Sequence, residues 1–214
     1  MAIRIRSSFH AGGKPRSMAE LASVIAMLAW KLAIASIKRM REAEYDIDLG
    51  SAYFDFVCEF MIFLALAADR VAYRELTPEQ RMEFTTALAQ RIAAAIDDNR
   101  DMLLYDVAPG KVRQHVLDLF NKRGAEYGDH GYTEQGPDFG FRRCFAACLK
   151  EVLPEKDRLW AVDQVMEIES PEAIKALEKT LAGLFHPGEA KSRRPRALHA
   201  GNSASRAGNG KTGE

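Results

Sequence analysis

Helix-start signals recur along this chain, and each precedes a stretch whose apolar residues fall three or four positions apart. Ser17-Met18-Ala19-Glu20 and Thr77-Pro78-Glu79-Gln80 both have the capping-box pattern. In that pattern the side chain of the first residue accepts a hydrogen bond from the backbone amide of the fourth. The side chain of the fourth residue in turn accepts one from the backbone amide of the first. The chain shows no sustained alternation of apolar and polar residues, which half-buried strands require. The sequence therefore predicts an all-α protein.

The first half of the chain predicts three long helices. One begins after Ser17, a second runs from about Ser51 to Arg74, and a third runs from Thr77 to about Tyr105. Short turns between long helices make neighbours antiparallel. The second half predicts shorter helices over residues 111–127, 141–152 and 159–168, and a last one that Ser170 caps before Pro171. We expect a single-domain bundle of about six to seven helices.

The net charge is zero, from 30 basic and 30 acidic side chains, but the charges are unevenly distributed. Residues 1–16 carry four basic residues and no acid, residues 186–214 carry six basic and two acidic residues, and the region between them is acidic. The Gly- and Ser-rich end lacks apolar periodicity, so we expect it to be disordered. The chain is therefore divided into a basic arm (1–16), an all-helical domain (17–185) and a disordered basic tail (186–214).

Two observations favour a cytoplasmic protein. Leu21 to Trp30 is an uncharged run of ten residues between Glu20 and Lys31, whereas a transmembrane helix needs about 20 apolar residues. The three cysteines are an odd number without a regular framework, which is typical of a reducing compartment. We expect no transmembrane segment and no specific nucleic-acid partner, and at most weak contact of the basic tail with anionic surfaces.

Asp55 and Glu59 lie one turn apart on an otherwise apolar helix, so they are the first candidates for a site. A carboxylate pair on a helix can bind a metal ion. The competing interpretation, which we favour, is structural: Glu59 forms an ion pair with Lys31, because buried charges are tolerated mainly when they are paired.

The second candidate is the glycine-rich segment 124–140, which we expect to be a long loop. It holds the densest polar and aromatic cluster of the helical domain, including Asp129, His130, Tyr132 and Glu134. Long loops in compact domains are often functional, and glycine lets a backbone approach a ligand closely. The alternative is a packed connector whose aromatic residues fill the bundle.

Cys144 and Cys148 share one face of a predicted helix and could supply half of a metal site, but no second Cys or His pair has ligand spacing. We therefore expect both to be buried thiols, and we expect no cofactor.

Since the sequence shows no set of residues typical of a catalytic site, it favours a non-catalytic binding or association protein. The apolar circumference of the first helix predicts either a central position or a homodimer interface. The alternative is a metal- or small-ligand-binding helical protein that uses Asp55 and Glu59 or the 124–140 segment.

Overall fold

The computed structural model describes residues 16–47, 50–99 and 110–186, and it confirms the all-α, multi-helix fold. Apart from Arg16 and His186, the basic arm and the basic tail lie outside the described residues, and so does the predicted continuation of the third helix to Tyr105. The expectations for these segments therefore stay predictions.

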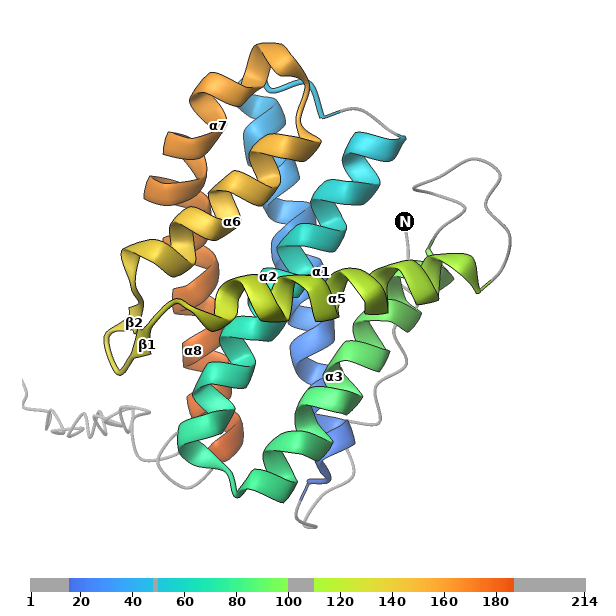
Figure 1. The fold of residues 1–214 in the computed structure, drawn as a ribbon, viewed down its shortest axis with the longest axis vertical. Coiled ribbons are helices and arrows are strands. Elements are labelled where there is room, and N and C mark those ends of the chain that lie inside the picture. The colour runs from blue at the N-terminus through green and yellow to red at the C-terminus, as the bar shows by residue number, and fades with distance from the viewer. Residues whose placement is uncertain (1–15, 48–49, 100–109, 187–214) are drawn as a thin grey trace, which may run out of the picture.

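The three long helices are present, and each runs antiparallel to the one before it, so that α1 and α3 point the same way (Figure 1). They are α1 (Met18–Glu42), α2 (Ser51–Glu75) and α3 (Pro78–Asp98). Both capping boxes form: the Ser17 hydroxyl accepts from the Glu20 amide, and the Thr77 hydroxyl accepts from the Gln80 amide. These starts were predictable because the interaction is confined to four consecutive residues.

Helix α2 is the centre of the bundle. Every residue from Phe56 to Ala68 is buried, because α2 packs against α1, α3, α5, α6 and α8. Helix α1 packs against α2, α3 and α8, and several of its apolar side chains, including Val24, Leu28 and Leu32, are only half-buried. By length and composition α1 and α2 could each cross a membrane; 78% of the apolar window of α2 is buried in the bundle, and 39% of that of α1.

The second half of the chain packs across these three helices. Helix α5 crosses in front of α2 and α3 (Figure 1), α6 and α8 pack against α2, and α7 packs against α6. The remaining elements are α5 (Lys111–Gly128), β1 (Tyr132–Thr133), β2 (Gly136–Pro137), α6 (Phe139–Val152), a 3₁₀ turn (Glu155–Asp157), α7 (Arg158–Gln164), a π-helical turn (Val165–Glu169) and α8 (Ser170–Phe185).

The predicted N-cap at Ser170 is wrong. Ser170 has helical backbone angles, and the π-helical turn joins α7 to α8 without a break. The Ser170 hydroxyl is buried and has no hydrogen-bond partner among the described residues. Arg39 of α1 binds the fully buried Glu169 carboxylate at 2.5 Å, and this ion pair links α1 to the π-helical turn.

An aromatic cluster joins the two halves of the fold. Phe63 of α2 stacks on Phe145 of α6, with ring centroids 3.9 Å apart and planes inclined by 5°. Phe141 and Tyr127 contact Phe63 from the sides. All four side chains are buried, so this cluster holds α5 and α6 against the central helix.

Candidate functional site

A buried ion pair links the central helix to α5. Arg123 of α5 donates from Nε to Glu59 Oε2 at 2.9 Å and from Nη2 to Glu59 Oε1 at 2.5 Å. The two side chains are only 8% and 4% exposed. Burial raises the pKa of Glu59, and Arg123 opposes that rise. Burial also lowers the pKa of Arg123, but its bonds to the two carboxylates of Glu59 and Glu126 outweigh burial and leave that pKa above its usual value.

The pairing of Glu59 with Lys31 is therefore corrected. Glu59 was expected to pair with a cation, and it does so with Arg123. Lys31 is instead exposed on α1. Both oxygens of Glu59 accept from Arg123. Asp55 lies half-buried near His115, and burial raises its pKa.

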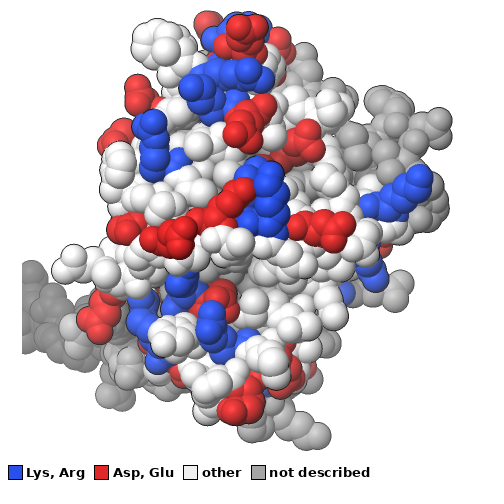
Figure 2. Space-filling view, in the orientation of Figure 1, with Lys and Arg blue, Asp and Glu red and all other residues white. Residues whose placement is uncertain are grey.

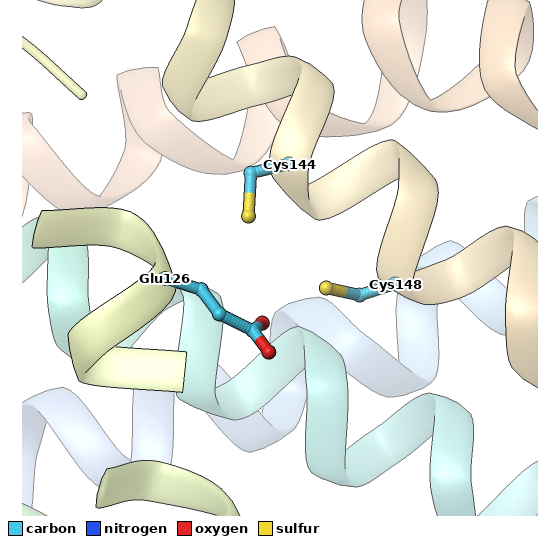
Figure 3. A group of neighbouring side chains, drawn as sticks. All are labelled: Glu126, Cys144 and Cys148. Atoms are coloured by element: carbon cyan, nitrogen blue, oxygen red, sulfur yellow. The ribbon is translucent and has the colours of Figure 1, made fainter. Parts of the chain in front are cut away.

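A thiol and carboxylate cluster lies beside this ion pair. Figure 3 shows the Cys144 and Cys148 side chains of α6 and the Glu126 side chain of α5 turned toward one another. Their ligand atoms all lie within 4.8 Å of each other. Glu126 also accepts from Arg123 Nη1 at 2.6 Å, so the cluster and the ion pair share that arginine. The expectation of buried thiols holds for Cys148, whereas Cys144 is half-buried.

The loop within the glycine-rich segment 124–140 is shorter than predicted. Helix α5 continues through Gly124 to Gly128, and α6 begins at Phe139. Between them β1 and β2 form a tight antiparallel hairpin, in which Gly136 has a φ of +99°. Such a φ favours glycine. Asp138 caps α6 by accepting from the Phe141 amide, and this bond together with that from Gly131 lowers its pKa.

The four residues predicted in this segment lie at different places. Asp129 ends α5 and is exposed, and His130 packs against Gly140, where an added Cβ would lie 2.7 Å from its Nδ1. The Tyr132 hydroxyl donates to Glu178 of α8 at 2.9 Å. Glu134, at the hairpin tip, lines a small pocket of about 170 Å³ beside α8. The segment joins α5 to α6, Tyr132 packs against Phe141, and residues of the hairpin line two pockets beside α8.

A larger pocket of about 500 Å³ lies between the hairpin, α6 and α8. This volume is within the range of small-molecule sites. Its lining combines three cations with apolar side chains: Gln135, Pro137, Arg142, Pro171, Ile174, Lys175, Glu178 and Lys179.

Arg142 is the most constrained cation of this pocket. Its Nη1 lies 3.4 Å from the Met166 carbonyl in the π-helical turn, and its buried Nε has no hydrogen-bond partner in the part of the chain that the structure describes. Lys175 and Lys179 lie one turn apart on α8, and the structure shows neither in an ion pair with a described residue. Glu178, the lining carboxylate, already accepts from Tyr132. The pocket therefore has an excess of positive charge.

One face of the molecule carries charges of both signs. Figure 2 shows basic and acidic side chains interspersed over it rather than gathered by sign. A mixed surface of this kind gives weak long-range attraction to polyanions. The positive pocket is therefore a local feature.

Comparison with known proteins adds no relative. No family model matches the chain, and no curated protein or solved structure matches it.

Residues that the sequence analysis did not single out make up most of these sites. Arg123 continues the apolar stripe of Val112, Val116, Phe120 and Tyr127, so a charge at that position could have indicated its buried partner. The lysines of α8 and Arg142 carried no comparable signal, because surface lysines on a helix are the common case.

Proposed function

We propose that this protein is a non-catalytic binding protein and that the pocket between the hairpin and α8 binds a small organic anion. One observation carries the proposal: Arg142, Lys175 and Lys179 line the same pocket, and the buried Arg142 Nε has no described partner. The guanidinium of Arg142 and the two lysine ammonium groups are the charges that a bound carboxylate or phosphate would pair with. Ile174 and the two prolines supply apolar contact for the remainder of such a ligand.

Replacing Arg142 with glutamine is expected to weaken anion binding by about 10- to 100-fold. A hydrogen bond to a charged group contributes about 1.5–3 kcal/mol, and about 1.4 kcal/mol corresponds to a tenfold change in affinity. The measurement is calorimetric titration with the best binder from a panel of carboxylates and phosphate monoesters, chosen by thermal shift. Arg143→Gln is the matched control, since Arg143 is the next residue on α6 and is exposed. Equal affinity in the two variants would contradict the proposal.

We infer a cytoplasmic location for this protein. The burial of α2 among five other helices supports this inference, because such a helix is covered by protein rather than lipid. The three cysteines are free thiols, as in a reducing compartment.

Self-association is the second candidate function, and two large exposed side chains favour it. Leu159 and Trp160 of α7 are 73% and 65% exposed and adjacent in the chain. Tryptophan is enriched at the energetic centre of protein interfaces, so we propose that this pair contacts a second copy of the chain. Light scattering is expected to give a dimer mass for the wild type and a monomer mass for Trp160→Ala. A monomer mass for both proteins would remove this candidate.

A further inference from the structure

The Glu126, Cys144 and Cys148 cluster is independent of the anion pocket and has the composition of a metal site. We propose that these three residues bind a thiophilic divalent cation of the Zn²⁺ class, with water in the fourth position. Thiolate and carboxylate together are a known ligand set of Zn²⁺. Because α6 carries both cysteines one turn apart, their sulfur atoms share one face of the helix.

The distances suit closure around one ion. The three ligand atoms lie within 4.8 Å of one another. A tetrahedral ion with sulfur at about 2.3 Å and oxygen at about 2.0–2.2 Å needs ligand atoms roughly 3.5–3.8 Å apart. Side-chain rotations that move the ligand atoms by about 1 Å would bring them to these distances, so neither helix has to move.

Arg123 gives the carboxylate the support that metal ligands usually have. One oxygen of Glu126, Oε2, accepts from Arg123 at 2.6 Å. The other, Oε1, lies 3.9 Å from Nζ of the exposed Lys122, and a metal ion would take the place of that long ion pair. Ligating carboxylates are commonly held by such hydrogen bonds, which orient them toward the ion. Arg123 is itself fixed by Glu59, so the orientation of Glu126 is set from the central helix.

Binding of the divalent cation leaves the net charge of the cluster unchanged. Two S–H bonds break and release two protons to solvent, and two sulfur–metal bonds form, so one divalent cation replaces two protons. Because thiol ligands bind a metal ion as thiolates, metal binding releases protons and the affinity is expected to rise with pH.

The test is a Co²⁺ titration of the full chain, reduced with a phosphine and freed of metal. We expect one Co²⁺ per chain, a sulfur-to-cobalt charge-transfer band in the near ultraviolet, and displacement by Zn²⁺. Cys144→Ala and Cys148→Ala are each expected to weaken binding by more than about 100-fold, and Glu126→Gln by about 10- to 100-fold. Cys144 and Glu126 are partly exposed, so these two variants carry the test if Cys148→Ala does not fold.

Cys58→Ala is the matched control, because Cys58 is a buried thiol on α2 outside the cluster. It is expected to keep the band and the affinity, and so is Arg142→Gln. Absence of the charge-transfer band at millimolar Co²⁺ would overturn the proposal. Cobalt binding that Cys144→Ala and Glu126→Gln leave unchanged would overturn it as well. Neither result bears on the anion pocket.

Discussion

Arg123→Met is expected to lower the free energy of unfolding by about 3–5 kcal/mol, since it leaves the Glu59 carboxylate buried without a partner. Arg123 and Glu59 are 8% and 4% exposed, so water cannot take the place of the lost guanidinium without opening the bundle. Chemical denaturation followed by circular dichroism measures the change. The slope of the transition is expected to stay the same, because the fold is retained.

Two further variants separate the charge effect from a loss of packing. The double variant Glu59→Leu/Arg123→Met removes both charges, and it is expected to recover most of the lost stability. Lys122→Ala is the matched control: its ion pair with Glu126 is 3.9 Å long and exposed, so a change within about 0.5 kcal/mol is expected. A double variant as unstable as Arg123→Met would show that unpaired charge is not the cause.

Phe63→Ala is expected to cost about 3–5 kcal/mol, the usual range for emptying a large aromatic position in a core. Phe63 is fully buried and lies against the ring of Phe145 at 3.9 Å. Its removal leaves a cavity at the contact between α2 and α6, which close packing around α2 prevents from collapsing. The same denaturation experiment measures this change.

Phe139→Ala tests the same substitution at a surface position. Phe139 is the first residue of α6 and is 65% exposed. A change within about 0.5 kcal/mol is expected. If the two phenylalanine variants were equally stable, the aromatic cluster would not hold the second half of the chain to the first.

Interactions within a few residues were predictable from the sequence. The two capping boxes were located because each depends on side chains three positions apart. The antiparallel order of α1, α2 and α3 followed from the short turns between them. The buried ion pair was predictable only in part: a carboxylate in an apolar run requires a cation, but Arg123 is 64 positions away from Glu59. Lys31 and Arg123 are equivalent choices until the packing of α5 on α2 is known.

The glycine-rich segment was predicted to be a loop from its composition, but residues 124–128 belong to α5. Gly124 lies within α5, where a Cβ would meet a Leu66 methyl at 3.9 Å, an ordinary contact distance. Ser170 was predicted as an N-cap because the Ser-Pro sequence favours a helix start, whereas the chain is helical through it. Local preferences of this kind are weak and are often overridden by tertiary context.

The binding proposal rests on the Arg142 side chain, and its Nε–H resonance in ¹⁵N NMR spectra is the most direct test. The resonance is assigned by its loss in Arg142→Gln, and it is followed while the best-binding carboxylate or phosphate monoester is added. The proposal predicts a saturable shift of this resonance, with amides of Gln135 and Lys175 shifting at the same ligand concentration. A ligand that binds without moving the Arg142 resonance, or a panel in which no anion moves it, would contradict the proposal.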